Sequence, residues 1–341
     1  MKAPDFWWEP PGSMSDFLTP ASWIWSTVTK LRLRYGRWAK LDTPVICVGN
    51  LTVGGSGKTP TVAALVERLS DRKPHIVSRG YGGAVKGTVR VEPETHTAEE
   101  VGDEPLLHAR YAPTWVSPDR LAGARAAEAA GAGLIILDDG FQNPALGKDL
   151  SIVVVDAAVG FGNGCVVPAG PLREPVAEGL KRADLLLLIG SDKERADWAM
   201  PPGLDLPVIE AEIVPVVNPD YWYERRVAAF AGIGRPEKFF RTLRGLGARV
   251  VDFYKLPDHA EYNRQMDLED RRSFEETYDQ FRSRRFAQFL RDAHREGLEL
   301  VTTENDAARM TPAMRANVVV LPIKLEFQRA DALDAALAKL S

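Results

Sequence analysis

A short apolar run that leads directly into a glycine-rich loop and a Lys-Thr pair is the feature that most constrains this chain. Residues 44–48 have the composition of a buried strand, and residues 61–69 have that of a helix. The loop between them reads Gly-Asn-Leu-Thr-Val-Gly-Gly-Ser-Gly-Lys-Thr over residues 49–59. A strand, a glycine-rich loop and a helix in this order form the phosphate-binding unit of nucleotide-binding α/β proteins. The sequence therefore predicts a nucleotide-binding domain.

The residues of this loop have expected roles at a nucleotide phosphate. Its glycines allow backbone N–H groups to face the phosphate, and the helix N-terminus adds a favourable dipole. Lys58 is expected to reach the β- and γ-phosphates, and the Thr59 hydroxyl to bind Mg²⁺. Thr52 stands where the usual pattern has its first glycine, so we expect this end of the loop to open differently. The predicted nucleotide-binding residues are Thr52, Val53, Gly54, Gly55, Ser56, Gly57, Lys58 and Thr59.

After residue 43, apolar strands alternate with helices, which is typical of a parallel sheet covered by helices on both faces. A helix rich in alanine is expected over 118–130. The expected strands after the loop are 75–78, 134–137, 151–156 and 184–189. Prolines and a glycine over 201–207 mark a break in this alternation. We therefore predict a first α/β domain over 41–207, with a separate segment over 1–40 before it.

Beyond this break the sequence predicts a second, smaller α/β domain over 218–318. Its expected strands are 226–233, 249–253 and 298–302, and a long stretch of helical character and mixed charge covers 271–295. Two strand-like runs, 208–217 and 319–327, flank this domain and are expected to pair as a linker. A C-terminal helix is expected over 328–341.

Composition excludes several other classes of protein. The chain has 43 Lys and Arg residues and 47 Asp and Glu residues, a formal net charge of −4, which argues against a generally basic nucleic-acid binder. Its two cysteines, Cys47 and Cys165, are too few for a disulfide framework or a four-cysteine zinc site. No stretch reaches the ~18 uncharged apolar residues of a membrane-spanning helix. The start of the chain carries acids and prolines instead of a basic and then apolar stretch, so we expect no secretory signal.

The segment over 21–40 has a pattern of its own. Basic residues are interspersed in it, and no acid occurs between Asp16 and Asp42. Apolar residues recur every three or four positions and form one stripe on a helix: Ile24, Val28, Leu31, Tyr35 and Trp38. A basic amphipathic helix with aromatic residues is typical of a helix that lies in a membrane interface. The alternative is a helix whose stripe packs on its own domain and whose basic face is solvated.

Two carboxylates, Asp138 and Asp139, follow the apolar strand over 134–137. They stand at the carboxyl end of that strand, where open α/β sheets bind ligands. In phosphate-loop proteins an acid at this position holds the magnesium ion, directly or through water. The alternative is a turn or helix-cap role for these residues. The sequence favours a magnesium site here.

Three other motifs are ambiguous from the residues alone. Asp103 precedes a helix and is interpreted as its cap. A proline-rich loop over 168–174 either presents Arg173 to a phosphate and Glu174 to a metal, or is a surface turn. His259 follows an aspartate, and a lone Asp-His pair is more often structural than catalytic.

Together these motifs closely resemble one family, the tetraacyldisaccharide 4′-kinases, which make lipid A in Gram-negative bacteria. The matching motifs follow the family's order over about residues 50–260, and the likeness continues to Glu304. The family's phosphate loop commonly lacks the first glycine, which accounts for Thr52. The matching motifs are Gly49 to Pro60, Ser78-Arg79-Gly80-Tyr81-Gly82, Gly102-Asp103-Glu104-Pro105, Asp138-Asp139-Gly140-Phe141-Gln142, Pro168-Ala169-Gly170-Pro171-Leu172-Arg173-Glu174 and Asp258-His259.

The resemblance implies a reaction in which ATP, with Mg²⁺, donates its γ-phosphate to the 4′-hydroxyl of tetraacyldisaccharide 1-phosphate and forms lipid IVA. It implies a peripheral enzyme on the cytosolic face of the inner membrane. The expected partners are this lipid and the membrane surface, with neither nucleic acid nor an obligate protein partner. The resemblance also implies a P-loop domain and a smaller α/β domain, with a cleft between them and a two-stranded linker.

The resemblance further implies the roles of single residues. Asp103 is the expected base that takes the proton of the sugar hydroxyl, with His259 paired to it. Arg173 is expected to bind a substrate phosphate. The expected surroundings of the magnesium ion are Thr59, Asp138, Asp139 and Glu174. One departure is Asn305, where the family usually has lysine, so no role is expected of that position.

Two other functions compete with this one. A nucleotide-dependent switch or ATPase at the membrane surface would use the same loop and Asp138, but the chain has no guanine-reading Asn-Lys-x-Asp motif. A soluble small-molecule kinase would leave the aromatic, basic segment over 24–38 unexplained. A lipid kinase needs such an interface-seeking surface, whereas a soluble kinase does not.

Overall fold

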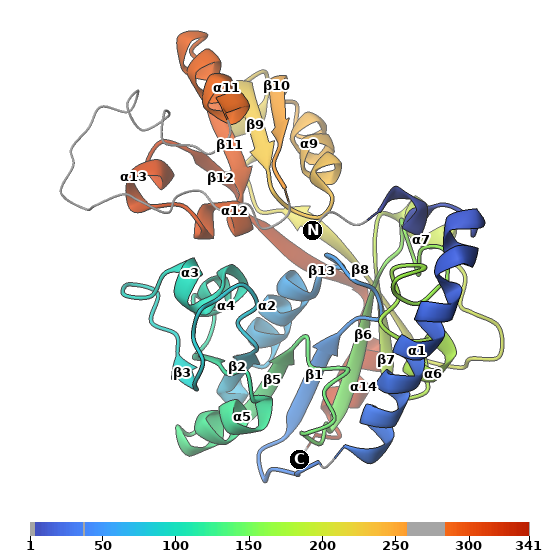
Figure 1. Ribbon diagram of the computed structural model, residues 1–341. Helices are drawn as coiled ribbons and strands as arrows, with labels where there is room; N and C mark the ends of the chain where they lie inside the picture. The colour runs from blue at the N-terminus through green and yellow to red at the C-terminus, as the bar shows by residue number, and fades with distance from the viewer. Residues whose placement is uncertain (1–3, 37, 258–283, 341) are drawn as a thin grey trace. The chain divides into compact units, whose positions relative to one another are not determined.

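The computed structural model describes residues 4–36, 38–257 and 284–340, and the chain forms two compact α/β units (Figure 1). Of these residues, one unit contains 4–214 and 324–340, and the other contains 215–257 and 284–323. Among the described residues, no helix combines the length and the apolar character needed to cross a membrane.

A nine-stranded sheet forms the centre of the larger unit, in the order β13-β8-β7-β6-β1-β5-β2-β4-β3. Neighbouring strands from β8 to β4 run parallel, and β3 pairs antiparallel with β4 at one edge. The expected strands from 44–48 to 184–189 are confirmed to within one residue at each end. The strands are β1 Val45–Gly49, β2 Pro74–Ser78, β3 Val89–Arg90, β4 Thr114–Val116, β5 Leu134–Asp138, β6 Leu150–Asp156, β7 Leu185–Ile189, β8 Val208–Pro215 and β13 Ile323–Arg329.

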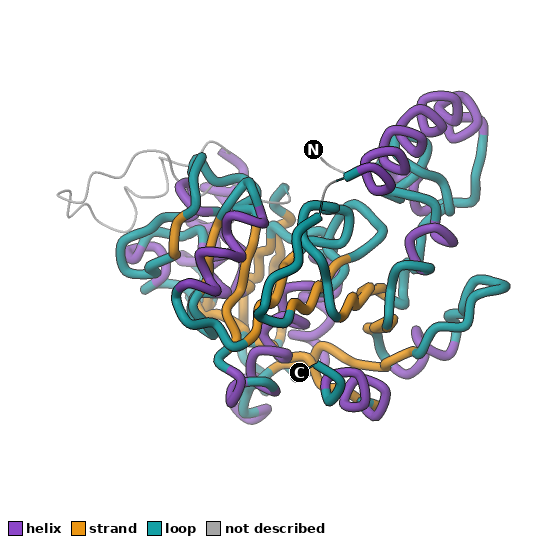
Figure 2. Tube along the Cα trace, turned by 90° about the horizontal axis from the view of Figure 1, so that it is seen from below, coloured by secondary structure: helices purple, strands orange, loops and turns teal. Residues whose placement is uncertain are grey.

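Both faces of this sheet are buried, because its central strands are apolar at successive positions. On β1, Ile46 and Val48 pack on the face covered by α2 and α14, whereas Val45 and Cys47 pack on the opposite face with α5. Helices accordingly flank the strands on both sides in Figure 2. The helices of this unit are η1 Asp5–Trp8, α1 Ser13–Tyr35, α2 Lys58–Arg68, η2 Ser70–Arg72, α3 Ala98–Val101, α4 Asp103–His108, α5 Arg120–Ala129, α6 Val176–Leu180, α7 Asp192–Ala196 and α14 Asp331–Leu337.

The smaller unit has a four-stranded parallel sheet in the order β10-β9-β11-β12. Its core lies on both faces, with Phe230 and Phe286 on one and Phe240 on the other. The predicted helical stretch over 271–295 is described only from Arg284 onward, and its beginning lies outside the described residues. The elements are α8 Pro219–Trp222, β9 Arg226–Ala231, α9 Pro236–Gly245, β10 Arg249–Lys255, α11 Arg284–Arg295, β11 Glu299–Thr303, α12 Glu304–Ala308, α13 Pro312–Arg315 and β12 Val319–Leu321.

The prediction of one strand over 319–327 is wrong. β12 ends at Leu321 in the four-stranded sheet, and β13 begins at Ile323 in the nine-stranded sheet, beside β8. Pro322 stands between them and has no N–H to donate to a strand ladder. Its carbonyl accepts a hydrogen bond from the Val216 N–H at 2.9 Å. The proline thus separates two short strands that the apolar pattern joins into one.

Helix α1 begins and ends earlier than the predicted segment over 21–40, and its buried face is polar. Its buried residues are Ser15, Ser22 and Thr29, seven positions apart. The Ser22 hydroxyl donates to the Val166 carbonyl at 2.7 Å and accepts from the Ala169 N–H at 3.1 Å. The apolar stripe from Ile24 to Tyr35 is exposed instead, and Trp38, which the pattern places on the same helix, lies beyond its end. The helix therefore does not pack on its own domain through this stripe.

Candidate active site

The phosphate loop leaves the carboxyl end of β1, next to β5 and β6 in the sheet, and enters α2. Gly57 is the N-cap of α2 and has a φ of +93°. A Cβ at this position would lie 2.7 Å from Cδ1 of Ile189, so both the backbone and the available space require glycine. The N–H groups of the first turn of α2 have no partner within the helix. A helix N-terminus of this kind attracts phosphate.

Thr52 fits the loop because its φ is not positive, so this position does not require glycine. The Val53 N–H donates to the Pro171 carbonyl at 2.8 Å, and the Arg173 N–H donates to the Leu51 carbonyl at 2.7 Å. The predicted difference from the usual loop therefore takes the form of a short antiparallel bridge. This bridge attaches the proline-rich loop, and with it Arg173, to the phosphate loop.

Lys58 and Arg173 converge on the carboxylate of Asp139. Arg173 Nη1 donates to both carboxylate oxygens, at 2.8 and 3.0 Å, and Lys58 Nζ lies 3.8 Å from Oδ1. Burial would raise the pKa of Asp139, but the charges of Lys58 and Arg173 hold it below its usual value. Arg120 donates to the Asp139 carbonyl at 2.6 Å. Two cations beside a helix N-terminus suit a terminal phosphate.

Asp138 ends β5 and is buried. Its Oδ2 lies 3.3 Å from the Ser78 hydroxyl and 3.3 Å from Nε2 of His108. Its Oδ1 is also buried, and it has no hydrogen-bond partner among the described residues. Burying an unpartnered carboxylate oxygen is unfavourable, and a bound cation is one group that satisfies it.

Glu104 is a site residue that the sequence reasoning missed. It lies in the first turn of α4, and its Oε1 accepts from the Thr59 hydroxyl at 3.3 Å. Burial and repulsion from the Asp138 carboxylate raise its pKa to about 7. Buried carboxyls with strongly shifted pKa values are concentrated at functional sites. The available signal was the pair of adjacent acids at 103 and 104, of which only the first was given a role.

We expect Glu104→Gln to stabilise the metal-free protein above pH 7. The pKa of Glu104 is raised from 4.5 to about 7, so the folded state binds this proton more tightly than the unfolded state. The ionised Glu104 carboxylate destabilises the folded state, and this effect is absent below pH 4.5 and complete above about pH 7. At about 1.4 kcal/mol per pKa unit, the effect is on the order of 3 kcal/mol. Melting curves in a chelator at about pH 8 and pH 5 should show the gain only at the higher pH.

Glu67→Gln, on the exposed side of α2, is the control for this experiment. It should shift the melting temperature equally at both pH values. Equal melting temperatures for Glu104→Gln and the unmodified protein at the higher pH would contradict the prediction.

Asp103 is the first residue of α4 and is buried, so it does not lie in a loop. The interpretation of Asp103 as the helix cap is wrong, because the N-cap is Gly102. Gly102 has a φ of +91°, and a Cβ there would lie 2.8 Å from the Tyr81 carbonyl. The charge of Asp103 contributes to the raised pKa of Glu104. His259 lies outside the described residues.

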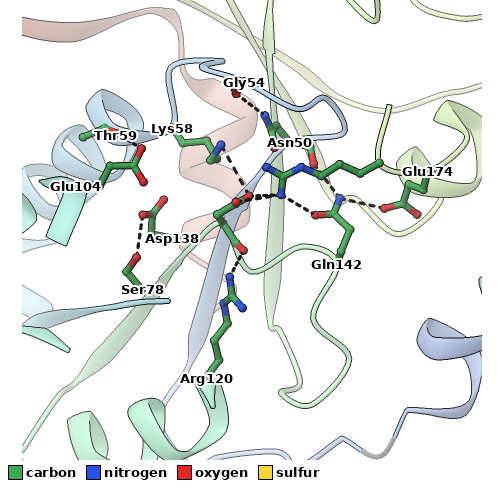
Figure 3. A network of polar contacts seen from close by, with 12 residues as sticks. Asn50, Gly54, Lys58, Thr59, Ser78, Glu104, Arg120, Asp138, Gln142 and Glu174 are labelled. Carbon is green, nitrogen blue, oxygen red and sulfur yellow. Dashed lines mark hydrogen bonds and ion pairs between the residues drawn. The ribbon is translucent and has the colours of Figure 1, made fainter. Parts of the chain in front are cut away.

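The Glu174 carboxylate accepts hydrogen bonds from an arginine and a glutamine, and it lies apart from Asp138. Both of its carboxylate oxygens accept from Arg182 Nη2 at 2.6 Å, and Oε1 accepts from Gln142 Nε2 at 3.1 Å. Figure 3 shows Glu174 beside Gln142 and apart from Asp138. Oε1 of Gln142 accepts in turn from Arg173 Nη1 at 3.4 Å. Glu174 therefore supports the side chains around Arg173.

In the described part of the chain, no three His, Cys, Asp or Glu side chains converge as a preformed metal centre. Mg²⁺ is commonly held by one or two carboxylates together with waters and substrate phosphates. The Thr59 hydroxyl, the Glu104 carboxylate and the unpartnered Oδ1 of Asp138 are hard oxygen donors near the phosphate loop. The donors present at the phosphate loop therefore fit a magnesium ion shared with a nucleotide.

Comparisons with known proteins find relatives over the whole chain. A family model described as tetraacyldisaccharide-1-P 4′-kinase matches residues 14–269 and 263–341. The tetraacyldisaccharide 4′-kinase of Jannaschia sp. is 48% identical over 344 residues, which cover all of this chain and 99% of that protein. That of Rhodospirillum centenum is 48% identical over 348 residues, which cover 100% of this chain and 97% of that protein. LpxK from Aquifex aeolicus, whose crystal structure contains ATP, is 29% identical with a TM-score of 0.75, covering 96% of this chain and 99% of that chain.

Proposed function

The chain belongs to the tetraacyldisaccharide 4′-kinase family, and we propose that it transfers the γ-phosphate of ATP to the 4′-hydroxyl of tetraacyldisaccharide 1-phosphate, forming lipid IVA. The observation in the molecule that carries this proposal is the convergence of Lys58 and Arg173 beside the phosphate loop. The names of the full-length relatives supply the acceptor, a lipid disaccharide.

Lys58 and Arg173 hold and neutralise the γ-phosphate. Catalysis of phosphoryl transfer depends almost entirely on positioning and on stabilising the negative charge of the transferred group. Both cations already face one anionic group, the Asp139 carboxylate. Asp139 keeps them aligned, and Arg120 fixes the backbone of Asp139 through its carbonyl. Arg173 presents parallel N–H donors, which suit the planar spacing of phosphate oxygens.

Thr59, Asp138 and Glu104 are the residues that hold Mg²⁺ in this proposal. Bound Mg²⁺ supplies positive charge to the β- and γ-phosphates. Glu104 reaches the Thr59 hydroxyl, and Asp138 offers a buried oxygen that no group among the described residues satisfies. Asp139 and Glu174, which the resemblance places at the metal, are paired with arginines, so we assign them to positioning those cations.

Asp103 takes the proton of the 4′-hydroxyl in this proposal. It lies one residue before Glu104 at the start of α4, so the same turn of helix carries the base and a ligand of the metal. A base at this place can accept the proton as the bond to phosphorus forms. The role of His259 as the partner of Asp103 rests on the resemblance alone.

A labelled-ATP experiment separates this function from its two alternatives. The protein is incubated with γ-labelled ATP and one of three acceptors: tetraacyldisaccharide 1-phosphate in detergent micelles, soluble glucosamine, or water alone. We expect label in the lipid only. Label in soluble glucosamine would support a soluble small-molecule kinase. Inorganic phosphate released at the same rate with and without lipid would support an ATPase or switch.

We further propose that the protein acts as a peripheral enzyme on the cytosolic face of the inner membrane. Phe17, Trp23 and Ile24 on α1 are 80, 68 and 69% exposed. Val28, Leu31 and Tyr35 continue this exposed apolar surface along the same helix. Contiguous exposed apolar surface of this kind marks an interaction site, and the basic residues of α1 suit anionic lipid. A lipid substrate lies in the membrane, and a kinase that acts on it needs a surface of this kind.

Replacing Phe17, Trp23 and Ile24 together by serine is expected to release the protein from anionic vesicles. Full burial of a large apolar side chain contributes ~1.5–3 kcal/mol, and burial in an interface contributes less. A combined loss of about 3 kcal/mol corresponds to binding weaker by roughly 100-fold. The fold should be unaffected, because the three side chains are exposed. Vesicle co-sedimentation measures the binding, and a melting curve checks the fold.

The matched control replaces Tyr223, Val251 and Phe253 by serine. These are exposed apolar residues of the smaller unit, away from α1 in the sequence. The control variant should sediment with vesicles as the unmodified protein does. Undiminished sedimentation of the α1 variant would contradict the assignment of α1 to the membrane.

A further inference from the structure

His108 is a fully buried polar side chain to which the proposed reaction assigns no task. It ends α4, the helix that begins with Asp103 and Glu104. Its Nε2 lies 3.3 Å from Oδ2 of Asp138, and its Nδ1 is buried with no hydrogen-bond partner among the described residues. Burying an imidazole with one nitrogen unpaired is unfavourable, so the contact with Asp138 needs an explanation.

The hydrogen-bonding roles in this pair follow from chemistry. An ionised carboxylate only accepts hydrogen bonds, so Nε2 of His108 carries the hydrogen and donates to Asp138. In the neutral ring Nδ1 is then an acceptor without a donor, whereas the opposite tautomer would leave a buried N–H without an acceptor and no bond to Asp138. The imidazole therefore presents its N–H to Asp138 and to no other group that the structure describes.

This bond, together with a second one, fixes the orientation of the Asp138 carboxylate. The Ser78 hydroxyl, on β2, donates to the same oxygen, Oδ2, also at 3.3 Å. Two donors from different elements on one oxygen prevent the carboxylate from rotating freely. Oδ1 is the oxygen left without a hydrogen-bond partner in the part of the chain that the structure describes. The geometry thus selects which oxygen of Asp138 is offered to a cation.

The same bond also attaches α4 to β5. Glu104 stands four residues before His108, so the two side chains lie on one face of the helix. Because α4 has only six residues, a bond at its last residue also constrains its first turn. That turn carries Glu104, which contacts the Thr59 hydroxyl, and Asp103. The placement of both carboxylates relative to Asp138 therefore depends on His108.

We propose that His108 is a positioning residue that orients the Asp138 carboxylate and holds α4 against it, so that Asp138 and Glu104 bind one Mg²⁺ together. The inference rests on the proposed function, because it takes these two carboxylates as ligands of the metal. Hydrogen-bonding partners of metal ligands typically contribute 10- to 100-fold to metal affinity.

The test compares His108→Leu with His108→Gln in the full chain. Glutamine carries an amide N–H at the distance of Nε2, whereas leucine fills the space without a donor. Mn²⁺ binding is measured by electron paramagnetic resonance, with a non-hydrolysable ATP analogue present. We expect His108→Leu to bind Mn²⁺ 10- to 100-fold more weakly than the unmodified protein, and His108→Gln to lie within about threefold of it.

Three further variants complete this test. His75→Leu, which removes another buried histidine three residues before Ser78 on β2, should leave Mn²⁺ binding unchanged. Should the leucine variant not fold, His108→Asn replaces it, because asparagine keeps the amide but is too short to reach Asp138. Asp138→Asn sets the level of binding without a functional metal ligand.

Undiminished Mn²⁺ binding by His108→Leu would overturn the proposal, as would equal losses in the leucine and glutamine variants, which indicate a packing role. In both cases the proposed function stands if Asp138→Asn still loses the metal. If the unmodified protein binds Mn²⁺ no better than Asp138→Asn, the metal assignment itself fails, and the role of His108 fails with it.

Discussion

Lys58→Ala is expected to lower kcat by roughly 10²–10³-fold, the loss that follows removal of one preorganised stabilising group in a water-excluded site. The side chain is buried and its ammonium group lies 3.8 Å from Asp139, on the same carboxylate as Arg173. Without it, the γ-phosphate loses one of the two cations that neutralise its charge, and Arg173 alone faces Asp139. Initial rates at saturating ATP and lipid give kcat directly.

Two other lysine variants sharpen this measurement. Lys58→Arg keeps the charge but replaces a compact ammonium group with a planar guanidinium group, so we expect only partial activity. Lys86→Ala, at an exposed position of the larger unit, should leave kcat unchanged. Near-normal turnover of Lys58→Ala would refute the phosphate-loop assignment.

Asp103→Ala is expected to lower kcat by ~10²–10⁴-fold, the usual contribution of a positioned base. A sugar hydroxyl is a poor nucleophile until its proton leaves, and Asp103 is the acid that we assign to this step. ATP affinity should change little, because the phosphate loop, Lys58 and Arg173 are untouched. His259→Ala should have an effect of the same kind if the two residues act as one unit.

The double variant of Asp103 and His259 provides the control for this prediction. If the pair acts together, its loss is much smaller than the product of the two single losses. Strictly multiplicative losses would mean that the two residues act separately. A large loss of ATP binding in Asp103→Ala would instead place Asp103 in the metal site, beside Glu104.

The sequence predicts much of the nucleotide-binding unit because local patterns determine it. The strand before the loop, the helix after it and the strand that ends at Asp138 each depend on residues adjacent in the chain. The bridge between Val53 and Pro171 could not be predicted in this way, because its two partners are more than 100 residues apart. That bridge explains why threonine is accommodated at position 52, and it places Arg173 beside the phosphate loop.

The roles of Glu104 and His108 depend on contacts with distant parts of the chain, which the residue pattern does not reveal. Their importance appears only when α4 is seen beside β5 and α2, with one side chain reaching Thr59 and the other reaching Asp138. The residue pattern also does not show which face of α1 contacts the domain. An apolar stripe usually packs inside a domain, but here serines and a threonine contact the domain and the stripe is exposed.

The most direct test of the central claim is to follow label from ATP into the lipid. The protein is incubated with tetraacyldisaccharide 1-phosphate in micelles and with ATP labelled at either the γ- or the α-phosphate, and Lys58→Ala serves as the blank. Mild acid then removes the phosphate at the anomeric 1-position and leaves any phosphate at the 4′-position. We predict acid-stable label in the lipid from γ-labelled ATP only, and at least roughly 100-fold less from the blank. ATP consumption without acid-stable label in the lipid would contradict the account.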